Sequence, residues 1–529
     1  MNGRDRIARA AGTMSIATLL SRILGYLKDM ILARYFGATG LSDTFFVAFR
    51  IPNLLRELFA EGSMSSAFIP VLTEYNTKEG FSEAKRLTRI AFTFLFVIVG
   101  LICILGIILT PQIVAIIAPG FLKDPSKFDQ TVLLTRIMFP FLLFISLASI
   151  TMGALNTKKV FFIPALAPAM LNITIIAVIL LFAYRVKEPI VVVAAGVTLG
   201  GLVQFLFQLP AFFSSGYDLR PDFSFRHSGL RRIALLVTPA TMGMAVAQIN
   251  IFVSTILASY LPQGSITYLY YSMRLVQFPV GIFGVAMGMA VLPMLSEHAA
   301  RGDRERMRDD ISFSLRLLFF ITVPAMAGLI GLREQIVNIL FQRGVFDYNA
   351  TMGTSEALLF YSIGIWAIVG VRVMTASFYS LHDTKTPVKV AIIAMSTNII
   401  FSILLMRFMK HSGLAFANSI ASILNLTVLF YLLRKRLGRI DGRRIISSLI
   451  KTSIASILMA LSGWFVINLW SLKGGGDLWK TSGMGAIKSV YLGGTMLLCL
   501  AIYLLISALL KSEEFSYLYG TMVKRLTNR

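Results

Sequence analysis

Residues 90–117 decide the fold: IAFTFLFVIVGLICILGIILTPQIVAII holds 28 residues and no charged side chain. An α-helix crosses the hydrocarbon core of a bilayer with about 20 apolar residues, so this stretch is long enough to span a membrane. The rest of the chain has the same character. Of its 529 residues, 56% are hydrophobic and 14% are charged, and the mean hydropathy is +0.75. Soluble domains carry about 25% charged residues, so these figures exclude a soluble fold and predict an all-α polytopic membrane protein.

Stretches of this kind recur along the chain, and we predict fourteen transmembrane helices from them. The predicted spans lie near residues 12–35, 43–69, 90–117, 132–155, 161–184, 190–213, 233–260, 267–293, 312–331, 354–380, 388–408, 413–433, 447–470 and 487–510. Charges interrupt the first two, which are therefore the weakest by hydropathy. We interpret the first as a retained helix and not as a signal peptide, because no small-residue cleavage site follows it.

Lys and Arg side chains are distributed unevenly between the predicted connections. With the N-terminus in the cytoplasm, about 30 of them fall in inner segments and about 11 in outer ones, which is the positive-inside bias of membrane proteins. This bias accounts for most of the formal net charge of +24 without a nucleic-acid partner. It predicts an even number of spans, with both termini cytoplasmic.

Short segments recur at an offset of about 225 residues. ILARY at 31–35 resembles ILASY at 256–260, and FIPVLTE at 68–74 resembles VLPMLSE at 291–297. The offset covers six predicted helices, so both copies cross the membrane in the same direction, as in transporters whose two lobes rock around a central site. The prediction is two lobes related by a pseudo-two-fold axis, followed by an appendix. Its boundaries are 1–215 for the N-lobe (helices 1–6), 216–440 for the C-lobe (helices 7–12) and 441–529 for helices 13–14 with a cytoplasmic tail.

Nine Lys and Arg residues lie within or beside the predicted spans. A cation at the bilayer centre costs roughly 2.5–3.5 kcal/mol, so such a residue faces a wet cavity, pairs internally or reaches the interface. Five of them lie near span ends, where snorkelling explains them; these are Arg34, Arg50, Arg136, Arg316 and Arg372. The other four need a functional explanation: Arg22, Lys28, Arg56 and Arg274.

Acidic residues near these cations are candidates for charge pairing or gating. Asp29 can neutralise Arg22 or Lys28 in the first helix. In the second helix, Glu57 or Glu61 can pair with Arg56. Asp43 stands at the outer end of that helix, where it is expected to cap the helix or to form part of a gate.

The eighth predicted helix combines a cation with glycines. Arg274, Gly281 and Gly288 follow at seven-residue spacing, so a uniform helix places them on one stripe, with Gln277 and Gly284 beside it. Close helix packing through small residues would explain the glycines, but not the arginine. A cavity wall explains both, because the glycines make room while the polar side chains offer donors. The hinge or cavity-wall candidates are therefore Gly25, Gly281, Gly284 and Gly288.

Together these residues predict an anion site between the lobes, with phosphate as the natural ligand. Arginine suits phosphate because its planar fork binds two oxygens at once. The predicted substrate-binding residues are Arg22, Lys28, Arg56, Arg274 and Gln277. The four histidines show no metal-ligand spacing, and no phosphate-binding loop of the ATPase type occurs. No metal, cofactor or catalytic residue is therefore expected.

Several segments carry recognisable sequence motifs. They are SRILGYLKD at 21–29, FGA at 36–38, SDTFFVAFRIPNLLR at 42–56, FAEG at 59–62, AFIPV at 67–71, APGF at 118–121, YYSMRL at 270–275, FYS at 378–380 and DTKTPV at 383–388. With these motifs the chain closely resembles, nearly end to end, the bacterial MurJ (MviN) family of lipid II flippases. That family belongs to the MOP superfamily, with the MATE drug exporters and polysaccharide flippases.

The resemblance implies fourteen helices, of which the last two line a groove for a lipid tail. It implies that the protein moves lipid II, the undecaprenyl-pyrophosphate-linked peptidoglycan precursor, from the inner to the outer leaflet of the bacterial cytoplasmic (inner) membrane. Such transport serves cell-wall biogenesis and cell shape. The essential cavity cations of the family match Arg22, Arg56 and Arg274, and its acidic positions match Asp29 and Asp43.

The chain departs from the family pattern at three points. Lys28 replaces an arginine, which keeps the charge but loses the fork. Met273 stands where some members have an acidic residue. A sodium site described in some members uses carboxylates in helices 7 and 11, and neither helix carries one here, which argues against sodium coupling.

The resemblance favours alternating access through a cationic cavity, but it leaves the driving force open. An anion that moves outward runs with the inside-negative potential, which supplies about 2.3 kcal/mol per charge per 100 mV. Membrane potential and an ion gradient are both open as energy sources. The expected partners are lipid II and the membrane, with cell-wall synthesis enzymes as a further alternative.

The same residues bear on three other classes of function and on a second possible substrate. A flippase for another polyprenyl-linked oligosaccharide would use the same cavity. A cation-coupled drug exporter ranks lower, because organic cations favour carboxylates over an arginine cluster. A membrane glycosyltransferase would need a large catalytic loop, and no predicted connection exceeds about 25 residues. A non-transporting scaffold would not need buried arginines.

Overall fold

The computed structural model describes residues 3–57, 63–472, 478–480 and 485–527. These residues form helices joined by short connections, and none of them lies in a β-strand. The chain divides into two compact units, 1–263 and 264–529. The prediction of an all-helical polytopic fold is confirmed for the described chain.

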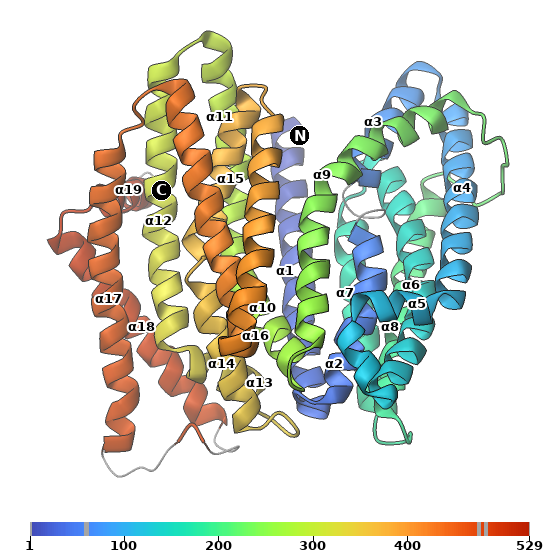
Figure 1. Ribbon diagram of the computed structural model, residues 1–529. Coiled ribbons are helices and arrows are strands. Elements are labelled where there is room, and N and C mark those ends of the chain that lie inside the picture. Colours follow the sequence, from blue (N-terminus) through green and yellow to red (C-terminus); the bar gives the residue numbers. More distant parts are fainter. Residues whose placement is uncertain (1–2, 58–62, 473–477, 481–484, 528–529) are drawn as a thin grey trace. The chain divides into compact units, whose positions relative to one another are not determined.

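The first unit contains ten helical elements (Figure 1). They are α1 (Gly3–Phe36), α2 (Gly40–Arg56), α3 (Ser63–Lys78), α4 (Phe81–Ile108), α5 (Thr110–Ile117), the 3₁₀-helix η2 (Pro119–Lys123), α6 (Pro125–Thr157), α7 (Phe162–Phe182), α8 (Pro189–Ser214) and α9 (Ser228–Ser259). α6 is the central element, since it packs against α2, α3, α4 and α8, while α7 packs between α8 and α1. The C-terminal helix of the unit, α9, packs against α3, α4, α5 and η2.

The second unit contains the remaining elements. They are α10 (Ser265–Pro279), the π-helix η3 (Val280–Gly284), α11 (Val285–Arg301), α12 (Arg304–Gly331), α13 (Arg333–Phe341), α14 (Tyr348–Ser362), α15 (Ile365–Ser380), α16 (Lys385–Leu437), α17 (Gly442–Leu472), α18 (Gly485–Leu509) and α19 (Glu513–Thr527). α12 packs against α15 and α17, and α17 packs along α18. The short amphipathic helix α19 contacts α12 and α18.

Ten helical segments of the described chain are long and apolar enough to cross a membrane. They correspond to eleven of the fourteen predicted spans, because α16 contains both 388–408 and 413–433. α16 is kinked between these spans at Lys410, which has φ 51°. The three other predicted spans lie on α1, on α2 with α3, and on α9.

The predicted span 43–69 differs from the structure in its bounds. The described residues there belong to two helices, α2 and α3, and the segment 58–62 between them lies outside the described residues. Hydropathy alone could not find this division, because both helices are moderately apolar and each contains an internal proline, Pro52 or Pro70.

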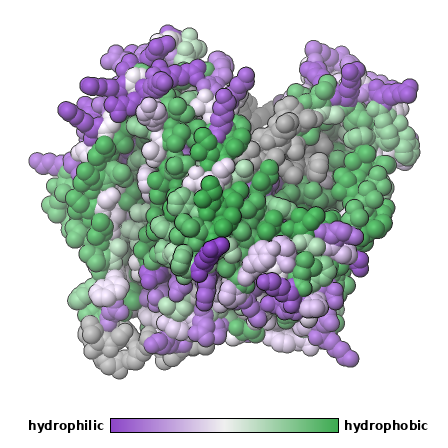
Figure 2. All heavy atoms as spheres, viewed as in Figure 1, coloured by the Kyte–Doolittle hydropathy of each residue, from purple (hydrophilic) through white to green (hydrophobic). Residues whose placement is uncertain are grey.

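Hydrophobic side chains form a band over the middle of the helices in each unit, with hydrophilic residues toward the helix ends (Figure 2). Many large apolar residues of the described chain are exposed, among them Ile104, Leu181, Phe408 and Leu497. Such extensive exposed apolar surface is unstable in water and is expected where the surrounding medium is lipid.

The connection between α8 and α9 is held against the end of α4. Arg89 donates two hydrogen bonds to the Asp218 carboxylate, and the Lys85 ammonium lies 3.0 Å from the same carboxylate. The guanidinium of Arg89 holds the pKa of Asp218 well below its usual range, chiefly through these hydrogen bonds. The carboxylate is therefore charged at neutral pH, and it fixes the connection at the charged end of α4.

Candidate anion-binding site

A polar cluster joins α2 to α9 within the first unit. The Arg56 guanidinium donates a hydrogen bond from Nε to Oδ1 of Asn53 at 3.1 Å, and its Nη2 lies 3.7 Å from Oε1 of Glu57. Nδ2 of Asn53 donates to the same Glu57 oxygen at 3.0 Å. Nε2 of Gln248, on α9, donates to the other Glu57 oxygen at 2.5 Å. Glu57 therefore contacts side chains of two different helices, and one of these side chains, Arg56, is a cation.

Three of these residues share one face of α2 because they are spaced by three and four positions. The side chain of Arg56 retains 19% of its surface exposed and that of Glu57 retains 35%. The arginine is consequently paired but not sealed, and its distance to the carboxylate is longer than that of a direct ionic hydrogen bond. An incoming anion could compete with Glu57 for this guanidinium.

The predicted residues of α1 lie in different environments. Arg22 is exposed, whereas Gly25 is buried. Lys28 forms an ion pair with Asp29, with Nζ 3.1 Å from Oδ1, and the Asp29 side chain is fully buried. Of the two predicted substrate-binding cations in α1, Arg22 and Lys28, it is Lys28 that pairs with Asp29.

Asp43 lies inside the first turn of α2 and not at its cap. The helix begins at Gly40, and the N-cap position is Thr39. The capping alternative for Asp43 is therefore wrong, because the helix starts earlier than the polar residue suggested. A buried carboxylate in the first turn still interacts favourably with the helix dipole.

In the second unit, α10 carries Arg274 and Gln277. Arg274 is half-buried and Gln277 is exposed. A π-helical turn follows directly after Pro279 and covers Val280–Gly284. Proline lacks the N–H of a regular helix and its ring clashes with the preceding turn, so a change of helical pitch at this point has a local cause.

The π turn changes how the glycines of this helix are arranged. A uniform helix was needed to place Arg274, Gly281 and Gly288 on one stripe, and a wider turn between them breaks that alignment. This part of the prediction is wrong. A methyl group added at Gly284 would lie 3.1 Å from Cγ1 of Val369 and 3.2 Å from Cδ of Arg372, while one added at Gly288 would lie 4.0 Å from Cβ of Arg372. Two of the glycines therefore face α15.

Two residues of these clusters were missed from the sequence. Gln248 is an uncharged residue in a long apolar helix, and its only signal is that a polar side chain there needs a partner. Arg372 was interpreted as an interfacial cation. Arg372 lies in one apolar helix and the glycines near it lie in another. Their proximity could not be predicted, because contacts between helices cannot be inferred from a single sequence.

The predicted cations belong to separate units. Arg22, Lys28 and Arg56 lie in residues 1–263, and Arg274 lies in residues 264–529. Among the residues that the structure describes, no group of three His, Cys, Asp or Glu side chains could hold a metal ion. Each unit thus offers guanidinium groups, which are suited to bind carboxylate or phosphate oxygens.

Long apolar helices with charged clusters inside their bundles define a multi-pass membrane protein of the transporter class. The family model described as lipid II flippase MurJ matches residues 32–478. A probable lipid II flippase MurJ from Vibrio cholerae is 37% identical over 432 residues, covering 80% of this chain and 82% of the relative. A lipid II flippase MurJ from Burkholderia cenocepacia is 36% identical, covering 81% and 84%. The chain belongs to the MurJ family, whose members are transporters of the bacterial inner membrane and not enzymes.

Solved structures agree with this assignment. A structure of lipid II flippase MurJ in an inward closed conformation superimposes with a TM-score of 0.76 at 29% identity, covering 94% of this chain and 98% of that one. A MATE-family multidrug transporter of the MOP superfamily, in an inward-facing conformation, has a TM-score of 0.65 at 15% identity. The second likeness concerns the fold alone.

Proposed function

We propose that this protein translocates lipid II from the inner to the outer leaflet of the bacterial inner membrane, for peptidoglycan synthesis. The observation that carries the proposal is the similarity to lipid II flippases over at least four fifths of the chain, at 36–37% identity. A sugar-peptide pyrophosphate head group bears many polar groups, and each costs kilocalories to move through hydrocarbon. A polar path through a helical protein removes that barrier.

The proposed topology has fourteen spans with both termini in the cytoplasm. It consists of an N-lobe (1–215), a C-lobe (216–440) and two further helices within 441–529. The distribution of Lys and Arg supports the orientation. The kink at Lys410 supports the separation of two spans within α16. The boundary between the two compact units falls between residues 263 and 264 of the sequence, whereas the proposed lobes are defined by the sequence repeat.

The proposed substrate site consists of Arg22, Lys28, Arg56, Arg274 and Gln277, with the pyrophosphate as the bound group. Binding at Arg56 would draw its guanidinium away from Glu57, since one fork cannot satisfy two oxyanions equally. Glu57 would then keep its hydrogen bond from Gln248 on α9. Occupancy of the anion site is in this way linked to the contact between α2 and α9, and this link is the proposed route from binding to alternating access.

The charge-pairing residues tune this site. Asp29 and Glu57 each lie beside a cation, so they reduce the repulsion within an empty cationic cavity. Asp43 is proposed as a gating residue, and Gly25, Gly281, Gly284 and Gly288 as hinge or cavity-wall positions. Outward movement of an anion is favoured by the membrane potential, which we propose as the energy source, with an ion gradient as the alternative. Enzymes that make or polymerise lipid II are candidate partners.

The test is depletion of the protein in its host, followed by measurement of lipid II in the outer leaflet with a leaflet-specific cleavage probe. Expression of the wild type should restore exposed lipid II, whereas Arg22→Ala, Arg56→Ala and Arg274→Ala should not. Arg34→Ala is the matched control, because Arg34 is an exposed cation near the end of the same helix as Arg22. Normal exposure of lipid II after complete depletion, with no redundant flippase, would overturn the proposal in favour of another polyprenyl-linked oligosaccharide.

A further inference from the structure

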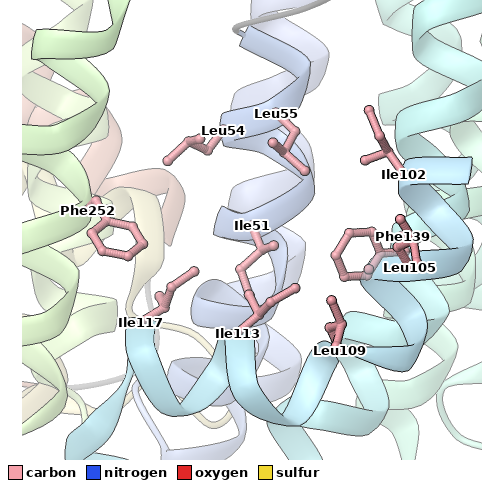
Figure 3. A pocket seen from close by; sticks show the side chains of 11 residues that line it. Ile51, Leu54, Leu55, Ile102, Leu105, Leu109, Ile113, Ile117, Phe139 and Phe252 are labelled. Atoms are coloured by element: carbon pink, nitrogen blue, oxygen red, sulfur yellow. The ribbon is translucent and has the colours of Figure 1, made fainter. Parts of the chain in front are cut away.

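The first unit contains an apolar pocket of about 370 Å³ that the anion site does not use (Figure 3). Its lining comes from five elements: α2, α4, α5, α6 and α9. Leu54 and Leu55 of α2, Ile113 of α5 and Phe252 of α9 point into one space in Figure 3. Every lining side chain is hydrocarbon. The volume lies within the range of ligand pockets, about 300–1,000 Å³.

One wall of the pocket is rigidly built. A methyl group added at Gly106 of α4 would lie 2.2 Å from the ring of Phe139. The ring therefore packs directly against the glycine, where no larger residue would fit. The pocket is not sealed, since Leu105 and Leu109 keep 47% and 46% of their surfaces exposed. Water gains little in such a space because it finds no polar partner. Its occupant is therefore hydrocarbon.

The pocket adjoins the Arg56 cluster at the edge shared by α2 and α9. On α2, Leu54 lines the pocket and Glu57 lies one turn further along. On α9, Gln248 and Phe252 are also one turn apart, and Gln248 binds Glu57. In both helices a polar residue and a pocket residue thus share one edge. A ligand at this edge contacts charged side chains and, one helical turn away, apolar side chains.

The order of these features matches one orientation of a membrane lipid. With the N-terminus in the cytoplasm, α2 runs inward and α9 runs outward, so the polar cluster lies on the cytoplasmic side of the pocket. A lipid whose head points toward the cytoplasm and whose chain points outward has the same order, and Leu105 and Leu109 place the pocket toward the outer end of α4. The pocket is too small for a whole polyprenyl tail, but it can hold the segment that follows the head group.

We infer that this pocket binds the head-proximal isoprene units of the polyprenyl chain while the pyrophosphate lies at the Arg56 cluster. The inference rests on the proposed function. In a polyprenyl pyrophosphate the charged group is esterified directly to the hydrocarbon chain, which fits the one-turn separation found here. A phospholipid places glycerol and ester groups between phosphate and chain, and these polar groups would have to enter the apolar pocket without partners.

The pocket contributes position more than affinity. A chain that leaves the bilayer for the pocket exchanges one hydrocarbon medium for another, so hydrophobic transfer favours neither. What remains is packing against a shaped wall, which fixes where the chain enters and hence where the pyrophosphate lies. Filling the pocket should therefore lower the rate of translocation without removing the anion site.

The direct test is photocrosslinking of the full-length protein in proteoliposomes that contain lipid II with a radiolabelled prenyl chain. A benzophenone amino acid at Ile113, inside the pocket, should crosslink to the labelled chain. The matched control is Ile116 on the same helix, which is 62% exposed and does not line the pocket. Unlabelled lipid II should compete for the Ile113 crosslink, and Arg56→Ala should weaken it. Crosslinks from Ile113 to bilayer phospholipid alone would overturn the inference.

A second test fills the pocket. Ile113→Trp should reduce lipid II flipping about tenfold through lost positioning, while Ile116→Trp should leave it unchanged. Ile102→Trp, on a different helix of the lining, guards against a folding defect of one variant, and thermal unfolding in detergent confirms that each is folded. Normal flipping by both filled, folded variants would disprove the pocket's role and leave the proposed function intact. Failure of the wild type to flip lipid II would instead disprove the function.

Discussion

Two arginines that the sequence places in different groups, Arg316 near a span end and Arg56 in the predicted anion site, have different surroundings. Nη1 of Arg316, on α12, lies 2.6 Å from Oε2 of Glu513 and 2.9 Å from Oε1 of Glu514. The side chain of Arg316 is 9% exposed and that of Glu514 is 2% exposed. Nη2 of Arg56, in the first unit, lies 3.7 Å from Oε1 of Glu57, and the Arg56 side chain remains 19% exposed.

The difference separates a cation that holds the fold from one that can bind a ligand. The two carboxylates next to Arg316 come from the start of α19, so this ion pair fixes the C-terminal helix to α12. Ser512 donates a further hydrogen bond to Glu514 at 2.8 Å, which holds the carboxylate in place. The contact between Arg56 and Glu57 is longer, at 3.7 Å, so an anion can replace that contact at lower cost.

The largest expected effect is on stability, at the tighter pair. Arg316→Ala leaves the buried Glu514 carboxylate without its cation, and we expect a loss of roughly 3–5 kcal/mol in the free energy of unfolding. Denaturant unfolding in detergent measures it. Arg316→Met combined with Glu514→Leu should recover much of the loss, because neither charge is then left unpaired. If Arg316→Ala were as stable as the wild type, Arg316 would not have the structural role assigned to it.

The next effect is on substrate binding, at the looser pair. Arg56→Ala should weaken lipid II binding by about 2–5 kcal/mol and leave the thermal unfolding temperature close to that of the wild type. Arg56→Lys should lie between the two, since it keeps charge but loses the fork. Binding to the detergent-solubilised protein and flipping in proteoliposomes are the measurements. A variant that unfolds early but binds normally would place Arg56 in the same structural role as Arg316.

A smaller effect is expected where glycine makes room for a third arginine. Gly284→Ala brings a methyl group to 3.2 Å from Cδ of Arg372 and 3.1 Å from Cγ1 of Val369, so these two side chains must move by a few tenths of an ångström. Overpacking of this kind costs about 1–3 kcal/mol. Gly288→Ala is the control, because its methyl group would lie 4.0 Å from Arg372. Equal unfolding temperatures for the two variants would contradict the close approach at Gly284.

The smallest effect concerns a charge pair outside the membrane spans. The Arg89 guanidinium lowers the pKa of Asp218 below its unfolded value of about 3.9. Its stabilisation is therefore complete above that value and is lost only as pH falls through the lower folded value. Asp218→Asn should cost about 1 kcal/mol, and the difference from the wild type should be the same at pH 5 and pH 8. A difference that shrinks between those two values would show that another group titrates there.

Much of the fold was predictable because a bilayer imposes simple rules. The need for about 20 apolar residues per span located eleven predicted spans on the ten long apolar segments of the described chain. The residues 43–69 were less predictable, because charges and prolines blur the hydropathy of α2 and α3. Asp43 was also misjudged as a cap, since the start of α2 depends on backbone geometry that a polar residue does not reveal.

The candidate site was only partly predictable. The sequence indicated Glu57 or Glu61 as the partner of Arg56, because both carboxylates follow the arginine closely in the chain and need no contact between distant segments to reach it. It could not indicate Gln248, which reaches Glu57 across 191 positions. It also could not distinguish Arg316 from other cations near span ends, because its partners lie 197 and 198 positions away.

The sequence by itself determined the medium in which this protein folds, the predicted orientation of its ends and the family to which it belongs. These properties depend on local composition and on short motifs, and both are set by residues that lie close together in the chain. Tertiary structure alone decided which cations are satisfied, that a π turn interrupts the glycine pattern beyond Arg274, and that an apolar pocket adjoins the Arg56 cluster. Each of these depends on distances between helices, and those distances are set by packing between side chains far apart in the chain.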